Sequence, residues 1–218
     1  MRFVDDATGD DAPRSVAEAA AAPRPAGDGA PSDDTPQWVE TLYGDTTLEW
    51  RMLVALDSRS EAAAAPLPEK VESQDLVYGE FAVADGLEVV DKALALAGGR
   101  PGRLVDVGSG CGRLVLALAR RHRDREVVGV EIQPRLHAIA ESARDASGLP
   151  NARLVCEDLH ASSAFDGAAV AFCYSTALHD DDDDLAADLS DALARGLEAG
   201  SIAVTTDRRL RACDFDLV

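Results

Sequence analysis

Short apolar runs of strand length alternate along this chain with stretches whose apolar residues recur every three or four positions. The runs predict five strands, at Leu104–Asp106, Glu126–Glu131, Arg153–Cys156, Ala168–Cys173 and Ser201–Thr205. The stretches between them predict helices after Gly112, from Pro134 and over Leu185–Gly196. Strands that alternate with helices through short links predict an α/β fold, a Rossmann-like doubly wound parallel sheet.

Two more helices are predicted before the first strand. Thr46 stands at the start of a capping-box spacing, and the apolar residues after it predict a helix that ends near Asp57. A loop is expected over Ser58–Pro68, which is rich in Ala and contains Pro. Asp85 begins a second capping-box spacing, and the helix after it is expected to end at Gly98.

Three regions follow from this pattern. Residues 1–36 are rich in Ala, Pro, Asp and Gly without apolar periodicity, so a disordered leader is expected there. Residues 37–84 are expected to form an N-terminal helical segment and a loop, and residues 85–218 the α/β domain. The formal net charge of −19 disfavours binding to nucleic acid or to an anionic membrane.

The four cysteines are scattered, with no paired spacing and no neighbouring histidines, which argues against a metal site or a disulfide framework. No secretory signal or membrane-spanning run is apparent. These features indicate a reducing compartment, the cytoplasm or the nucleus.

A glycine turn follows the first predicted strand, at Gly108, Gly110 and Gly112, and a helix follows the turn. Glycine lets the backbone take positive φ and lets a ligand approach it closely, while the start of a helix offers unpaired N–H groups. The turn therefore predicts a site for a ligand with a carboxylate, ribose or phosphate. A dinucleotide is disfavoured, because its fingerprint would place the last glycine at Arg113.

Acidic residues stand at or just beyond the ends of three strands, at Asp106, Glu131 and Asp158. Each alone could cap a turn, end a strand or begin a helix. Carboxyl ends of parallel strands share one edge of a sheet, where ligands bind. Their joint placement therefore favours a ligand site.

These motifs carry a resemblance. Val105–Gly112 resembles the first motif of class I S-adenosylmethionine-dependent methyltransferases, and Val128–Glu131 resembles their second-strand motif. The resemblance implies S-adenosylmethionine as cofactor, with Glu131 on the ribose hydroxyls, Asp158 on the adenine amine and Leu159 over a ring face. The remaining implied cofactor residues are Asp106, Gly108, Ser109, Gly110, Gly112 and Ile132.

A narrower resemblance lies upstream. Val77–Phe81 is similar to the cofactor loop of the non-SET histone lysine methyltransferases named for disruption of telomeric silencing. The resemblance implies that Tyr78 and Glu80 close over the methionine end of the cofactor, and that the chain is a protein lysine N-methyltransferase. This sequence has Phe81 where that family has a small hydroxyl residue, and Cys173–Thr176 where it has an asparagine-rich motif.

The methyl acceptor is expected beyond the fourth strand, beside Tyr174 and Ser175, which are the candidate catalytic residues. The acidic run His179–Asp184 either begins a helix in solvent or attracts a basic protein substrate. No metal is needed for methyl transfer from a sulfonium.

The C-terminal part is short for such an enzyme. Methyltransferases of this class add a helix and an antiparallel hairpin after the fifth strand, whereas here Asp214–Val218 is expected only to begin a sixth strand. The hairpin is therefore expected to be missing, through truncation or because a partner completes the sheet. The alternatives are a small-molecule or other protein methyltransferase on the same scaffold, and a catalytically silent cofactor-binding scaffold.

Overall fold

The computed structural model describes residues 34–44, 46–63, 68, 71, 76–177 and 186–218. The leader expected at residues 1–36 lies outside this part of the chain except for its last three residues, of which Thr35 and Pro36 already belong to a helix. The acidic run at residues 179–184 also lies outside the described residues.

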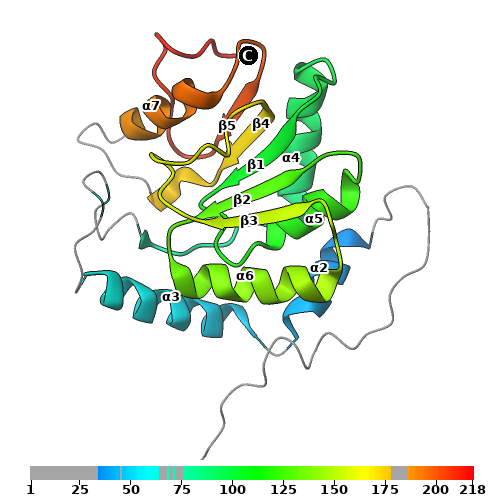
Figure 1. Ribbon diagram of the computed structural model, residues 1–218, viewed down its shortest axis with the longest axis vertical. Coiled ribbons are helices and arrows are strands. Elements are labelled where there is room, and N and C mark those ends of the chain that lie inside the picture. Colours follow the sequence, from blue (N-terminus) through cyan, green and yellow to red (C-terminus); the bar gives the residue numbers. More distant parts are fainter. Residues whose placement is uncertain (1–33, 45, 64–67, 69–70, 72–75, 178–185) are drawn as a thin grey trace, which may run out of the picture.

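Five parallel strands form one sheet in the order β3-β2-β1-β4-β5 (Figure 1). They are β1 (Arg103–Val107), β2 (Val127–Glu131), β3 (Ala152–Cys156), β4 (Ala168–Cys173) and β5 (Ile202–Thr205). The order changes direction at β1, because β2 and β3 lie on one side of it and β4 and β5 on the other. This confirms the predicted fold class and places the glycine turn at the switch point, where open α/β sheets bind ligands.

The two faces of the sheet belong to two separate cores. Leu104 packs in the first core with α4 (Val83–Leu96), α5 (Arg113–Arg121) and α6 (Pro134–Ser147). Its neighbours Val105 and Val107 differ: both lie in the second core, against α7 (Ala187–Gly196) and the loop around Phe165. Both faces of the sheet are thus covered, which explains why its central strands are apolar almost throughout.

The N-terminal helices are α2 (Thr35–Tyr43) and α3 (Leu48–Ala63), and both pack against α6. The prediction that α3 ends near Asp57 was wrong. The helix continues through the first six residues of the expected loop, because Ala and Glu are good helix formers and no Gly or Pro interrupts them there.

Two predicted caps were also wrong. Thr47, not Thr46, accepts the Trp50 N–H at its Oγ1 (3.3 Å), while the Thr46 hydroxyl donates to the Tyr43 carbonyl (2.5 Å). Helix α4 begins two residues before Asp85, which therefore lies in the first turn, where its charge still favours the helix.

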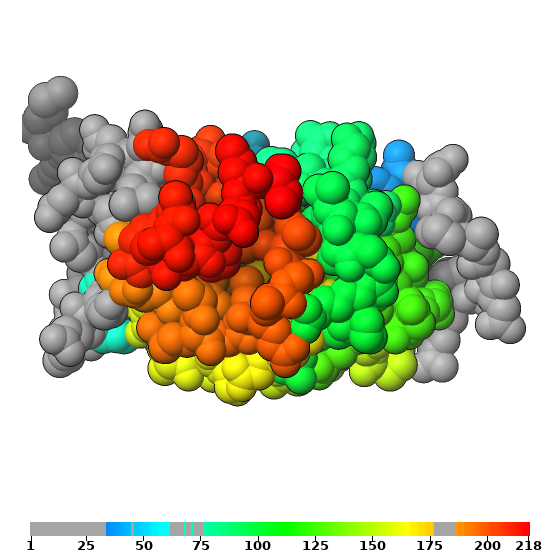
Figure 2. All heavy atoms as spheres, turned by 90° about the horizontal axis from the view of Figure 1, so that it is seen from above, coloured from blue at the N-terminus to red at the C-terminus, as the bar shows by residue number. Residues whose placement is uncertain are grey.

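The last residues of the chain do not form the expected sixth strand. Asp214 and Phe215 both donate their N–H groups to the Arg211 carbonyl at 3.1 Å, which makes a turn, and the Phe215 ring packs on the second core. Figure 2 shows this C-terminal segment (red) against the orange surface of α7. Within the described part of the chain, no helix is long and apolar enough to cross a membrane.

The first core makes a direct prediction about stability. Leu116 on α5 is fully buried, so Leu116→Ala should lower the free energy of unfolding by about 2–5 kcal/mol through lost burial and the cavity left behind. Leu96→Ala at the exposed end of α4 is the matched control and should change it by less than about 0.5 kcal/mol. Urea denaturation measures both, and equal effects would contradict the assigned core.

Candidate active site

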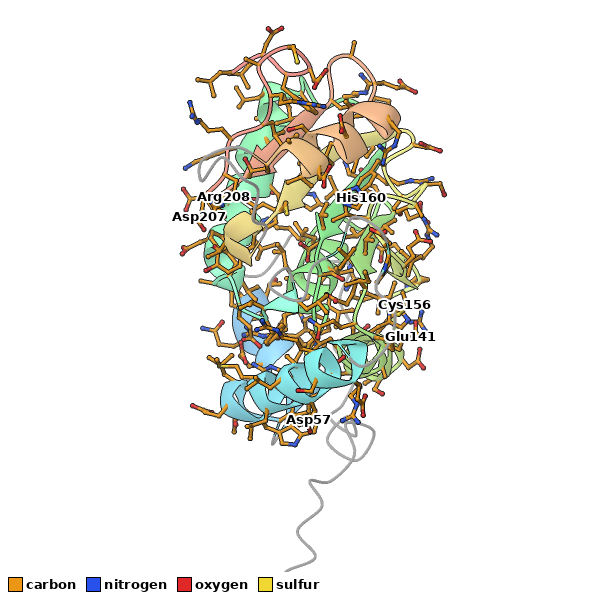
Figure 3. The ribbon with its side chains drawn as sticks, turned by 90° about the vertical axis from the view of Figure 1, so that its left-hand side faces the viewer. Asp57, Glu141, Cys156, His160, Asp207 and Arg208 are labelled. Atoms are coloured by element: carbon orange, nitrogen blue, oxygen red, sulfur yellow. The ribbon has the colours of Figure 1, made fainter. Side chains whose placement is uncertain are left out.

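A cavity of about 430 Å³ opens at the carboxyl ends of the strands. Figure 3 looks onto this edge, with Cys156 at the end of β3 and His160 after it on one side, and Asp207 and Arg208 after β5 on the other. Seven of the predicted site residues line the cavity: Tyr78, Gly108, Glu131, Ile132, Asp158, Leu159 and Tyr174. The structure thus brings together residues spread over almost 100 positions of the sequence.

A second cavity of about 40 Å³ adjoins the first and shares with it Tyr78, Gly79, Gly108 and Tyr174. Its other walls include the remaining predicted residues Glu80, Asp106, Ser109 and Gly110. Gly112 lines neither cavity, since it begins α5 against α6. A Cβ on Gly112, at φ +79°, would lie 2.9 Å from the Ala140 Cβ, so this glycine permits close packing of the helices.

The glycine turn is held against the end of β2. The N–H groups of Gly108 and Ser109 both donate to the Val130 carbonyl at 2.9 Å. Gly108 is exposed, with φ +71° and no atom within 4 Å of the position of a Cβ, so a ligand can lie against its backbone. The Ser109 side chain points away, toward Gly129, where a Cβ would lie 2.7 Å from its Oγ.

Glu131 joins the turn to α6. One carboxylate oxygen accepts the Gly110 N–H at 2.8 Å, and the other accepts the Gln133 N–H at 2.8 Å. Burial raises the pKa of Glu131, while the hydrogen bonds from Gln133 and Gly110 act in the opposite direction. An ionised carboxylate has about four acceptor positions, so each oxygen can still accept a bond from a hydroxyl group in the cavity.

Asp106 lies beneath the turn at the end of β1 and is buried. Burial, and then the negative charge of Glu131, raises the pKa of Asp106 to about 8. Near neutral pH the side chain is therefore mainly protonated. A cationic ligand would favour its ionised form.

Asp158 and Leu159 follow β3 and face the cavity. One oxygen of Asp158 accepts the His160 N–H at 2.9 Å, which fixes the turn. Asp158 therefore has the ordinary turn-capping role and a place on the cavity wall at once. Leu159 packs on the second core and presents apolar surface to the same cavity.

Tyr174 stands where the two cavities meet, and its ring centroid lies 5.4 Å from that of Phe81. The other candidate catalytic residue, Ser175, lies away from both cavities. Ser175 is fully buried, lines neither cavity and donates its N–H to the Thr206 Oγ1 at 3.2 Å. Ser175 begins a short 3₁₀-helix, η2 (Ser175–Ala177), directly after Tyr174.

Glu80 faces arginines that the sequence interpretation missed. Its carboxylate accepts hydrogen bonds from Arg51 on α3, from Arg113 on α5 and from the Tyr78 hydroxyl. The position of Arg113 directly after the glycine turn was an available signal. Arg51 gave none, because nothing in the sequence relates it to a residue 29 positions away.

Residues 104–200 match the protein family described as "Methyltransferase domain". The match covers less than half of the chain. The parallel sheet with its glycine turn is the Rossmann-like α/β fold that the sequence motifs predicted.

Curated relatives match shorter stretches of the chain. A tRNA (guanine-N(7)-)-methyltransferase of Levilactobacillus brevis is 39% identical over 61 residues, 28% of each chain. One of Leifsonia xyli is 34% identical over 92 residues, 41% of this chain and 40% of the relative. The chain thus spans less than half the length of these relatives.

Solved structures share part of the fold. An amino pentose methyltransferase of Micromonospora echinaspora is 25% identical, with a TM-score of 0.47 over 58% of this chain and 51% of its own. A methyltransferase described as putative from Methanococcus maripaludis is 21% identical, with a TM-score of 0.47 over 56% of each chain.

S-adenosylmethionine is the cofactor that the sequence motifs imply, and the site fits it. Glu131 offers two oxygen atoms to a pair of hydroxyls, and Gly108 leaves its backbone open. Gln133 lines the cavity, and its buried Oε1 has no hydrogen-bond partner among the described residues. Such an acceptor is costly unless a ligand or water supplies a donor.

Asp106 predicts how stability depends on pH. Folded Asp106 keeps its proton up to about pH 8, whereas an unfolded aspartate ionises near pH ~3.9. Between these values the folded chain binds more protons than the unfolded chain, so the free energy of unfolding falls as pH rises.

Asp106→Asn cannot ionise, so its free energy of unfolding should fall less between about pH 5 and about pH 8 than that of the wild type. Urea denaturation across this range measures the slopes. The raised pKa of Glu131 also makes the free energy of unfolding fall as pH rises, in the wild type and in Asp106→Asn. Part of the pH dependence therefore remains in Asp106→Asn. Parallel slopes would show that Asp106 ionises normally in the folded chain.

Proposed function

We propose that this chain is an S-adenosylmethionine-dependent methyltransferase that methylates an amine of a basic protein. The observation that carries the first part is the buried Glu131, fixed by two backbone N–H groups at the wall of the larger cavity. A carboxylate held in this way is an acceptor-only group suited to two neighbouring hydroxyls.

The roles of the other residues follow from their places in the cavity. S-adenosylmethionine supplies an already activated methyl group. Glu131 binds the ribose hydroxyls, Asp158 accepts from the adenine amine, and Leu159 covers a ring face. Tyr78 and Tyr174 separate the larger cavity from the smaller one and exclude water from the methyl group. Holding donor and acceptor in near-attack geometry supplies much of the rate in such a displacement.

The charge of the cavity supports an amine as acceptor. Its carboxylates are those of Glu131, Glu157, Asp158 and Asp188, and no arginine or lysine of the described residues lines it. This field favours a cation, both in the cofactor and in an approaching substrate. An amine must lose its proton to attack, and the apolar, aromatic wall at Tyr174 lowers the pKa of an amine buried there.

A transfer RNA is the second candidate, because the curated relatives are named for methylation of guanine N7 in tRNA. The acidic cavity wall and the net charge of −19 disfavour a phosphate backbone. The acceptor is therefore the part of the proposal that needs a direct assay.

Cofactor binding tests the role of Glu131. Glu131→Gln keeps the shape of the side chain but removes the charge and one acceptor, so the affinity for S-adenosylmethionine should fall about 10- to 100-fold. Glu141→Gln, on the part-exposed face of α6, is the matched control and should bind as the wild type does. Calorimetry measures both affinities. Equal binding by wild type and Glu131→Gln would refute the cofactor site.

The acceptor is tested with the methyl-labelled cofactor and three substrates: a lysine-rich protein, bulk tRNA, and the small-molecule fraction of a cell extract. We expect label on lysine residues of the protein, and a rate that falls as salt is raised because the attraction is electrostatic. Label in tRNA would replace the protein by the second candidate. Label in small molecules alone would assign a metabolite acceptor, and no label anywhere would leave a cofactor-binding scaffold.

A further inference from the structure

The carboxylate of Glu80 is the centre of a buried network at the rim of the site. Arg51 donates from its Nε to one oxygen at 2.5 Å and from its Nη2 to the other at 2.9 Å. The Tyr78 hydroxyl donates to the first oxygen at 2.6 Å, and an Arg113 Nη donates to the second. Both oxygens of Glu80 therefore already serve two protein donors each.

This arrangement gives Glu80 a different role from the one its sequence motif implies. Its oxygens are occupied by Arg51, Arg113 and Tyr78, and it lines only the smaller of the two cavities. A carboxylate with four such donors is well placed to orient them. Glu80 thus connects the site to the helix that carries Arg51.

Arg51 is buried among residues of the N-terminal helices and the turn between them. It is 3% exposed, donates to the Thr46 carbonyl, and lies over the Tyr43 ring with its guanidinium carbon 5.4 Å from the ring centroid. The Tyr43 hydroxyl in turn donates to the carbonyl of Cys111 in the glycine turn, at 2.6 Å. A buried guanidinium is energetically unfavourable unless its donors are hydrogen-bonded. The pairing with Glu80 therefore stabilises Arg51 in its buried position on α3.

Tyr78 connects Glu80 to the glycine turn. Its ring lies directly over Gly110, where a Cβ would be only 2.6 Å from the Tyr78 Cε2. The Gly110 N–H is one of the two that hold Glu131. Burial raises the pKa of Tyr78, which keeps the hydroxyl protonated as a donor to Glu80. A continuous series of contacts therefore runs from Arg51 through Glu80, Tyr78 and Gly110 to Glu131.

We propose that Arg51 is a positioning residue for cofactor binding, which acts through Glu80 to hold the Tyr78 ring over the glycine turn. The N-terminal helices are on this basis part of the cofactor site, although they lie outside the matched domain at residues 104–200. The inference rests on the proposed function, because S-adenosylmethionine is the ligand whose affinity it concerns.

A double-mutant cycle on the full chain tests this coupling. Arg51→Ala frees the Glu80 carboxylate on one side, and Tyr78→Phe keeps the ring but removes the hydroxyl that Glu80 holds. Each should weaken S-adenosylmethionine binding about 5- to 20-fold, and the double variant should be no weaker than the weaker single variant, because residues in one network are not additive. Arg51→Lys, which keeps the charge, should recover part of the affinity.

Arg120→Ala is the control for loss of an arginine that holds an N-terminal helix, α2, against α5. Arg120 on α5 lies over the Trp38 ring of α2 at 4.5 Å and pairs with Asp34, but it does not contact Glu80 or Tyr78. The Arg120→Ala substitution should lower the melting temperature of the protein and leave its affinity for S-adenosylmethionine unchanged. Calorimetry gives the affinities, and thermal denaturation of each variant gives the fraction folded at the assay temperature.

The outcomes separate the two proposals. Multiplicative losses in the double variant, or wild-type affinity in folded Arg51→Ala, would overturn the positioning role while the wild type still binds the cofactor. A similar loss in Arg120→Ala would overturn it too, because loosening of the helices would then explain the effect. Failure of the wild type itself to bind S-adenosylmethionine would overturn the proposed function, and this inference with it.

Discussion

The carboxylate of Glu131 sets the geometry on which the rest of the site depends. It is buried at the end of β2, and a buried charge without hydrogen bonds is strongly unfavourable. The N–H groups that compensate it come from Gly110 in the turn after β1 and from Gln133 at the start of α6. One side chain therefore fixes the relative positions of two strands, a turn and a helix, and the cavity takes its shape from them.

The charged side chains differ between the two edges of the sheet where the parallel strands begin and end. At the amino edge Arg125 donates to the carbonyls of Arg100 and Gly102, and Arg103 and Arg153 pair with Glu126. At the carboxyl edge the cavity wall carries four carboxylates and, among the described residues, no arginine or lysine. Burial, and then the charge of Glu131, raises the pKa of Asp106, so Asp106 keeps its proton. The excess negative charge is thus concentrated where a cationic ligand can relieve it.

Most of the fold could be predicted from the sequence, because strand-length apolar runs, glycines and helix-stop residues are local signals. The bounds of β4 agree to the residue, and the end of β1 carries the glycine turn as expected. The errors lie where local signals compete. Either Thr46 or Thr47 could cap α3, and Thr47 does so because the Thr46 hydroxyl donates to the Tyr43 carbonyl three residues before it.

The site was predictable to the extent that it follows strand ends. Glu131, Asp158 and Tyr174 lie on the cavity because the carboxyl ends of parallel strands converge. Ser175 does not, because the chain leaves the strand and enters a short 3₁₀-helix in which Ser175 is buried. Arg51 was beyond prediction, because its partner Glu80 lies 29 positions away in a loop whose path is set only by packing.

The contacts of Phe81 bear on how the acceptor is chosen. Its ring lies 5.4 Å from both Phe172, at the core of β4, and Tyr174, at the junction of the cavities. Phe81 precedes the matched methyltransferase domain, so the wall nearest the expected acceptor is built partly by a segment that the domain does not contain. A cofactor motif and an acceptor wall can therefore vary independently, because they are encoded in different stretches of the chain.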